Sequence, residues 1–229
     1  MIDKEQTLGQ LATAVPAAAK VFYRHGLDYC CGGNKPLATA CAEHGLDVAE
    51  VLAELQAAAT TTPAAGASWA ERPIPELILH ILQRYHEPLK LEIPRLVELA
   101  FTVERVHAGR PGCPAGLANH LAEMRRSVDE HLLKEEQILF PLILAGRGRM
   151  ARMPIQVMLT EHDDHGQALR RTRALTDDLQ LPDGACAKWR ELYRALEELE
   201  QELMDHIFLE NSVLFPRALE GNGASQPLL

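Results

Sequence analysis

The sequence has few aromatic residues, no long apolar run and no excess of basic residues. Phe, Trp and Tyr make up 5% of the 229 residues, and alternating runs of β-branched residues are hard to find, which argues against a β-sheet protein. The net charge of −9 weighs against nucleic acid or an anionic membrane as a partner. No window reaches the length of an apolar membrane span. We therefore expect an all-helical protein that binds neither nucleic acid nor membranes.

Several common functional motifs are also missing. The sequence contains no phosphate-binding glycine loop and no Cys-x-x-Cys pair of the kind that holds zinc. Its five cysteines show no disulfide-framework spacing, which indicates free thiols or metal and redox chemistry in a reducing compartment. The charged amino terminus lacks the apolar segment of a secretory signal. We expect a cytoplasmic protein.

What the sequence does have is a segment that occurs twice. Residues 131–141 read HLLKEEQILFP, and residues 206–216 read HIFLENSVLFP. In each copy a His and a Glu stand four residues apart, which places both side chains on one face of a helix. A further His precedes each copy at nearly the same distance. The six candidate metal ligands are His86, His131, Glu135, His162, His206 and Glu210.

These residue types fall on the apolar seam of the predicted helices. With alternating steps of four and three, the first seam runs through Leu117, Leu121, Met124, Val128, His131, Glu135, Ile138 and Leu142, and the second through Trp189, Leu192, Leu196, Leu199, Leu203, His206, Glu210 and Val213. Such a repeat is typical of a helix bundle. A carboxylate on the seam must be paired, protonated or bound to metal. A single His-x-x-x-Glu is common by chance, but its duplication with this context favours metal.

The composition of the set indicates which metal. Four imidazoles and two carboxylates are more than one tetrahedral zinc ion takes, and this mixture suits iron or manganese. If both Glu residues bridge two ions, the set fits two iron ions joined by an oxo or hydroxo bridge. Open positions would then remain for dioxygen or nitric oxide. We predict a di-iron centre.

Other His residues are expected to have other roles. His107 follows His86 on the same predicted helix and should lie at the far end of the bundle, so it is only a weak additional ligand that a proline kink would have to bring close. His80, His120 and His165 lie off the seam or too far along it. We expect His165, the rival of His162, to be a solvent-facing residue or one that acts on a ligand from outside. Cys41 is expected in the core, Cys113 and Cys186 in loops.

Cys30 and Cys31 precede two glycines. We expect Gly32 and Gly33 to adopt positive φ and to leave the sulfurs accessible. The thiols could bind a metal, receive one from elsewhere, form a mixed disulfide, or simply pack before a turn.

The chain is expected to have two domains. Residues 1–57 form a small helical domain, with Thr7 as the N-cap of its first helix, a helix from Leu37 to His44, and a helix capped by Asp47 that ends near Ala57. Residues 58–73 have the composition of a linker. Residues 74–221 form a four-helix bundle whose third helix is expected to start at Pro154, and residues 222–229 a disordered tail.

The segments that carry the chemistry also occur together in one known group of proteins: Leu27–Gly33, Arg84–His86, Val103–His107, Lys134–Pro141, Glu161–Asp163, Asp205–His206 and Glu210–Asn211. With them the chain resembles, over nearly all of residues 7 to 220, the iron-sulfur cluster repair di-iron proteins, which have a hemerythrin-like fold. The resemblance implies that the six ligands above hold two irons. It also implies that Cys30 and Cys31 serve iron transfer or docking.

The resemblance further implies a stress protein that restores iron-sulfur clusters damaged by nitric oxide or oxidants, by supplying iron. Its partners would be damaged iron-sulfur proteins, with nitric oxide or dioxygen as small ligands, and we allow for a homodimer. Two alternatives stay open: enzymatic reduction of nitric oxide to nitrous oxide at the di-iron site, and binding or sensing of nitric oxide or dioxygen. Whether the protein is an enzyme is therefore left open.

Overall fold

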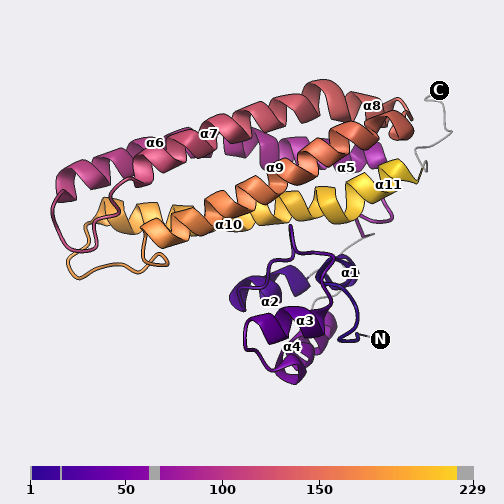
Figure 1. Cartoon of the computed structure of the whole chain (residues 1–229), viewed down its shortest axis with the longest axis horizontal. Coiled ribbons are helices and arrows are strands. Elements are labelled where there is room, and N and C mark those ends of the chain that lie inside the picture. The colour runs from indigo at the N-terminus through magenta and orange to yellow at the C-terminus, as the bar shows by residue number, and fades with distance from the viewer. Residues whose placement is uncertain (1, 16, 62–67, 221–229) are drawn as a thin grey trace. The chain divides into compact units, whose positions relative to one another are not determined.

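The computed structural model describes residues 2–15, 17–61 and 68–220. Every regular element within these ranges is helical (Figure 1), so the predicted all-α class is confirmed. No helix in this part of the chain is long and apolar enough to cross a membrane. The helices are α1 Leu8–Ala14, α2 Ala18–Arg24, α3 Leu37–Glu43, α4 Val48–Thr61, α5 Ile74–Ile81, α6 Glu87–His107, α7 Leu117–Lys134, α8 Phe140–Leu144, α9 Gly148–Leu175, α10 Ala187–Leu209 and α11 Phe215–Leu219, with the π-helical segments η1 Leu82–His86, η2 Glu135–Leu139 and η3 Glu210–Leu214.

The contacts divide the chain into two compact units. Unit 1 comprises Met1–Leu79, Leu142–Ile155 and Met204–Leu229, and unit 2 comprises His80–Pro141 and Gln156–Leu203. Helices α9 and α10 therefore contribute residues to both units.

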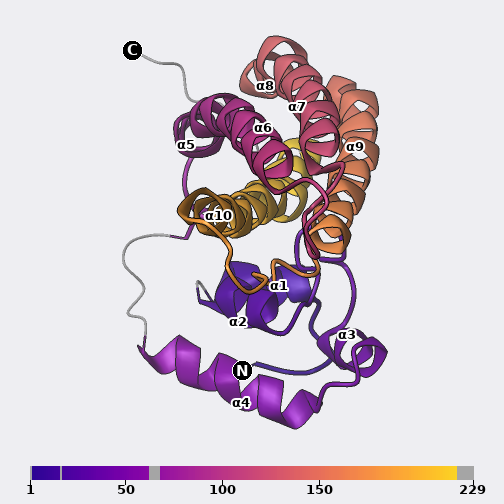
Figure 2. The same cartoon turned by 90° about the vertical axis from the view of Figure 1, so that its left-hand side faces the viewer.

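In the N-terminal part of unit 1, helices α1 and α4 begin with side-chain caps, whereas α2 and α3 begin without a side-chain cap hydrogen bond. The Thr7 hydroxyl accepts a hydrogen bond from the backbone N–H of Gln10, while the Gln10 side chain accepts one from the backbone N–H of Thr7, which is a capping box. An Asp47 carboxylate oxygen accepts a hydrogen bond from the Ala49 N–H, 2.8 Å away, at the start of α4. Both predicted caps are confirmed. Helix α4 packs on α2 and α3 (Figure 2).

Helix α4 continues past the expected end at Ala57, into the predicted linker 58–73. Residues 62–67 of that linker and the predicted tail 222–229 lie outside the described residues. The boundaries of the two domains therefore remain predictions.

In unit 1 the third long helix starts earlier than expected. Helix α9 begins at Gly148, so Pro154 lies inside it and does not start it. A Cβ atom added to Gly148 would lie 1.9 Å from the Ala218 carbonyl oxygen. The backbone can pass this close to Ala218 only because Gly148 has no side chain. A prediction that starts the helix at a proline does not take such a contact into account.

In unit 2, α6 and α7 lie side by side (Figure 2) and bury a layer of aliphatic residues. The fully buried members include Ile93, Leu96, Leu121 and Leu132. Pro88 follows η1 and stands in the first turn of α6, where the helix continues directly from η1. Pro94 lies inside α6, which continues to His107.

Each π-helical segment begins or ends at a candidate ligand. His86 is the last residue of η1, Glu135 the first of η2, and Glu210 the first of η3. A π-helical turn holds an extra residue, so the register of the helix shifts after it. The shift explains one wrong prediction on the seam: Ile138 is 53% exposed, and its neighbour Leu139 is buried instead.

Candidate metal centre

Unit 2 brings four candidate ligands close together. The donor atoms of His131, Glu135 and His162 all lie within 4.8 Å of one another. The two Nε2 atoms of His131 and His162 are 3.1 Å apart. A Glu135 carboxylate oxygen lies 3.4 Å from Nε2 of His131 and 3.5 Å from Nε2 of His86. All four side chains are buried.

Unit 1 holds the other two candidate ligands, one turn apart. His206 lies near the C-terminus of α10, and Glu210 is the first residue of η3. Nε2 of His206 lies 3.1 Å from a carboxylate oxygen of Glu210, and both side chains are fully buried. The predicted spacing thus places imidazole and carboxylate against each other in each copy of the repeated segment.

Hydrogen bonds on the far side of two rings set the chemistry of this cluster. Nδ1 of His86 lies 2.9 Å from a carboxylate oxygen of Glu136, and Nδ1 of His131 lies 2.9 Å from one of Glu161. Because a carboxylate only accepts, each Nδ1 carries a proton and donates it, and in a neutral ring this leaves the lone pair on Nε2.

The lone pairs on the Nε2 atoms indicate whether the site suits a metal ion. In the neutral rings, Nε2 of His86 and of His131 is an acceptor, and each faces the Glu135 carboxylate, which is also an acceptor. Opposed acceptors in a buried site are favourable only with a cation or proton between them. Imidazole nitrogen with carboxylate oxygen is a donor set that iron takes readily. The residues therefore fit a metal of this kind.

Two lysines hold the outer carboxylates. Nζ of Lys90 lies 2.6 Å from the Glu136 oxygen that faces His86, and Nζ of Lys134 contacts Glu161. Burial alone would raise the pKa of Glu136, but the hydrogen bonds from Lys90 and His86 outweigh it, so its pKa lies below the usual range. Glu136 is an anion at neutral pH.

The remaining histidines have separate neighbours. His107 packs on Trp189, with Nε2 3.2 Å from the Cys186 sulfur, and no group of three metal donors found among the described residues includes it. Nε2 of His120 lies 3.0 Å from both the Ala168 carbonyl oxygen and the Thr172 hydroxyl. Burial lowers the pKa of His120.

His165 differs from one of its two expected positions. It does not face solvent, because it is 2% exposed and its ring centroid lies 4.8 Å from that of His131. The Ser127 hydroxyl is 3.3 Å from its Nε2. Sequence placed it among Asp163, Asp164 and Gly166, but α9 turns it inward. His80 is half-buried, edge-on to Tyr85.

The segment with the adjacent cysteines is more closed than expected. Cys30 is 3% exposed, and its sulfur lies 3.6 Å from that of Cys31 and 3.2 Å from an Asp28 carboxylate oxygen. The hydrogen bond with Cys31 and burial raise the pKa of the Cys30 thiol well above its usual value. The donor atoms of Asp28, Cys30 and Cys31 lie within 4.8 Å of one another. The prediction that both sulfurs are accessible is wrong for Cys30.

The glycines of this segment are needed for a different reason than predicted. Neither Gly32 nor Gly33 is among the glycines with positive φ. A Cβ atom on Gly32 would lie 2.5 Å from the Asp28 carbonyl oxygen, and one on Gly33 2.9 Å from that of Tyr29. The chain folds back on its own carbonyl groups so tightly that no side chain fits.

Within unit 1 the Cys30–Gly33 segment is bound to residues next to His206 and Glu210. The Tyr29 hydroxyl donates a 2.6 Å hydrogen bond to Asp205, and the Asn211 amide donates one of 2.9 Å to the Cys30 carbonyl. Sequence reasoning gave these residues no role, because their partners are remote in the chain.

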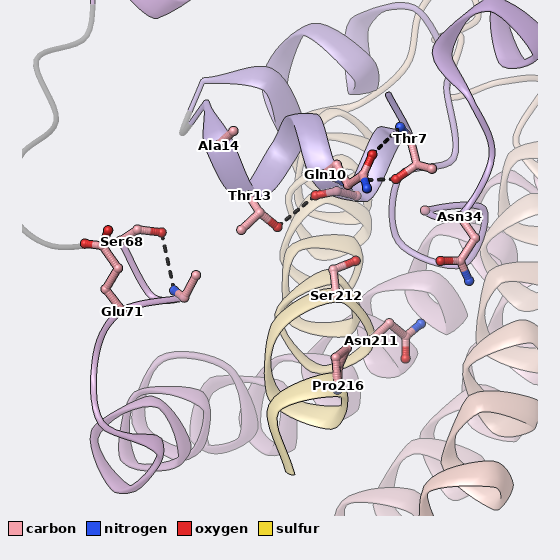
Figure 3. A pocket seen from close by; sticks show the side chains of 13 residues that line it. Thr7, Gln10, Thr13, Ala14, Asn34, Ser68, Glu71, Asn211, Ser212 and Pro216 are labelled. Carbon is pink, nitrogen blue, oxygen red and sulfur yellow. Dashed lines mark hydrogen bonds between the residues drawn. The ribbon is translucent and has the colours of Figure 1, made fainter. Parts of the chain in front are cut away.

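A polar cleft of about 610 Å³ lies beside this contact (Figure 3). Several of its polar groups already bond within the chain, including the Thr13 hydroxyl with the Gly9 carbonyl and the Ser68 hydroxyl with the Ala70 N–H. The lining residues are Thr7, Gly9, Gln10, Thr13, Ala14, Gly33, Asn34, Ser68, Ala70, Glu71, Asn211, Ser212 and Pro216.

Comparison with known proteins agrees with a helical, cation-binding fold. Residues 4–59 match a family described as a domain of unknown function (DUF542), and residues 77–218 match the hemerythrin HHE cation binding domain. The fold and the His and Glu clusters thus define a hemerythrin-type cation-binding protein with a small N-terminal helical domain.

Similar proteins identify the family more narrowly. The chain is 43% identical to the iron-sulfur cluster repair protein YtfE of Dickeya chrysanthemi, over 95% of this chain and 98% of the relative. It is 44% identical to the protein of that name from Edwardsiella ictaluri, over 96% and 99%, and 45% to that from Yersinia pseudotuberculosis, over 95% and 98%. The chain belongs to the YtfE family, which confirms the resemblance stated from its motifs.

Proposed function

We propose that this protein repairs iron-sulfur clusters damaged by nitrosative or oxidative stress, with a di-iron centre as its source of iron. The relatives named above are iron-sulfur cluster repair proteins. One observation in this chain supports the proposal most strongly. The buried Glu135 carboxylate faces the Nε2 atoms of two buried imidazoles, those of His86 and His131.

The proposed ligands are the six residues that the repeated segment and its upstream His supply. All six belong to groups of His and Glu that could hold a metal ion. Two anionic carboxylates and four neutral imidazoles would leave a net positive charge on two iron ions, which an oxo or hydroxo bridge would reduce. The ligands are His86, His131, Glu135, His162, His206 and Glu210.

Iron bound there would supply exchangeable ions for rebuilding a cluster and open positions for nitric oxide or dioxygen. The protein's residues would hold the Nε2 atoms of the imidazoles inward in a buried site. We propose that Cys30 and Cys31, held beside Asp205 and Asn211 in unit 1, help to pass iron to a damaged protein or to dock it. A cytoplasmic location follows from the proposed partners.

A repair assay tests this function. The iron-loaded protein is mixed anaerobically with a nitrosylated iron-sulfur enzyme, and recovery of that enzyme's activity is followed together with the iron that leaves. We expect activity to return as iron is transferred, and Glu135→Ala to support little recovery. No recovery with the fully loaded protein would contradict the proposal, and release of nitrous oxide on adding nitric oxide would favour the reductase alternative.

A further inference from the structure

Two of the proposed iron ligands, both histidines, form a hydrogen bond with a carboxylate through Nδ1, the ring nitrogen that faces away from the proposed metal. On one ring, Nδ1 of His86 donates to Glu136, and Lys90 donates to the same carboxylate oxygen. The glutamate is 26% exposed and the lysine 42%. This series of hydrogen bonds, from lysine to carboxylate to imidazole, therefore connects the surface with the buried Nε2 atom.

The second ring has the same arrangement built from different positions. Nδ1 of His131 donates to Glu161, and Lys134 donates to the other oxygen of that carboxylate. Glu161 is 22% exposed and Lys134 42%. Here the carboxylate precedes a candidate ligand, His162, on α9, whereas Glu136 follows Glu135 in η2. The two arrangements are therefore not copies made by the sequence repeat.

We propose that Glu136 and Glu161 are positioning residues that fix two imidazoles for iron, and that Lys90 and Lys134 hold these carboxylates in place. The proposal rests on the proposed function, because it takes His86 and His131 as ligands. An anionic acceptor at Nδ1 fixes the tautomer and orientation of the ring and makes Nε2 a stronger donor to metal. Loss of such a partner typically weakens metal binding about 10–100-fold.

The alternative is that these are ordinary surface ion pairs, which contribute little to stability and would not affect the metal. The distances argue against this view, because each carboxylate joins a half-exposed lysine to a fully buried ring. The pair formed by Arg173 and Glu200 provides a matched comparison. It is similarly half-buried, and the Glu200 carboxylate accepts a 2.9 Å hydrogen bond from the Arg173 guanidinium.

The test measures how fast the iron-loaded full-length protein gives up iron to a colorimetric chelator, together with its visible spectrum. Variants Glu136→Ala and Glu161→Ala are expected to release iron about 10–100-fold faster than the parent. Glu136→Gln and Glu161→Gln should be intermediate, because an amide oxygen still accepts the Nδ1 proton but carries no charge. Lys90→Met and Lys134→Met should change the rate in the same direction by less. The control Glu200→Ala should release iron at the parental rate.

Parental release rates and spectra in both Ala variants would overturn the inference. If an Ala variant does not fold, the Gln variant decides: faster release supports the inference, and unchanged release contradicts it. Glu135→Ala separates the two proposals. If it keeps its iron, the ligand assignment itself is wrong. If it loses iron while the Glu136 and Glu161 variants behave as the parent, only the positioning role fails.

Discussion

The side-chain amide of Asn211 donates a hydrogen bond to the backbone carbonyl of Cys30, at 2.9 Å, within unit 1. Asn211 follows the candidate ligand Glu210 directly, so the segment with the adjacent cysteines is bound to the π-helical turn that carries this ligand. The bond also helps to keep Cys30 in its buried position, where its thiol has a raised pKa.

Asn211→Ala should therefore make Cys30 more reactive. In the parent protein we expect iodoacetamide to modify the half-buried Cys31 before Cys30, because the Cys30 thiol is buried and resists ionisation. In the variant, Cys30 should be modified several-fold faster, as measured by mass spectrometry of the quenched protein. The control Asn34→Ala replaces an exposed asparagine of the same unit and should leave the order unchanged. Equal rates for Cys30 in the parent and in Asn211→Ala would contradict this role.

The adjacent thiols should be separable from iron binding. Because the six proposed ligands account for the metal, Cys30→Ser with Cys31→Ser should retain both irons but lose much of the cluster repair. Iron content and the repair assay measure the two effects independently. Repair at the parental rate would rule out a delivery role, and loss of iron would mean that the thiols reach the metal directly.

His120 is buried but has its own hydrogen bonds, so its removal should affect stability and leave the iron unchanged. His120→Ala should keep the parental visible spectrum and lower the free energy of unfolding by about 1–3 kcal/mol, because buried hydrogen bonds are lost. Denaturant titration of the metal-free protein measures the loss. A changed iron spectrum would place His120 at the metal and contradict the assignment.

The same residue predicts a pH dependence. Burial lowers the pKa of His120 in the folded protein, so the unfolded chain binds its proton more readily. The related stability is present above about pH 6.5, the usual value for His, and is lost as the pH falls from there toward the lowered folded pKa. The metal-free parent should thus lose more stability between pH 7 and pH 5 than His120→Ala does. Parallel pH profiles for the two proteins would show that His120 is not responsible.

The sequence predicted the helical class, the caps at Thr7 and Asp47 and the pairing of His131 with Glu135, because these follow from short-range spacing and helical periodicity. It also named His162 as a candidate ligand, and the structure brings the His162 donor atom close to those two residues. It could not predict the π-helical turns. The pattern of apolar residues assumes a constant helical register, so it named Ile138 for the core where the structure buries Leu139.

Features set by distant contacts were missed for a related reason. Glu136 and Glu161 form hydrogen bonds with rings from other parts of the chain, and the spacing of residues in their own helices does not indicate this. Gly32 and Gly148 are required by carbonyl groups that approach them closely, whereas glycine in a sequence suggests positive φ first. His165 was assigned partly to solvent from its polar neighbours, although its helix buries it.

The proposed centre consists of two iron ions held by six residues, and metal analysis of the purified protein tests it most directly. We expect about two irons per chain in the parent and in His120→Ala, and a sharp loss in Glu135→Ala, because Glu135 is fully buried and faces both His86 and His131. One zinc and no iron in the parent, or two irons retained in Glu135→Ala, would contradict the account.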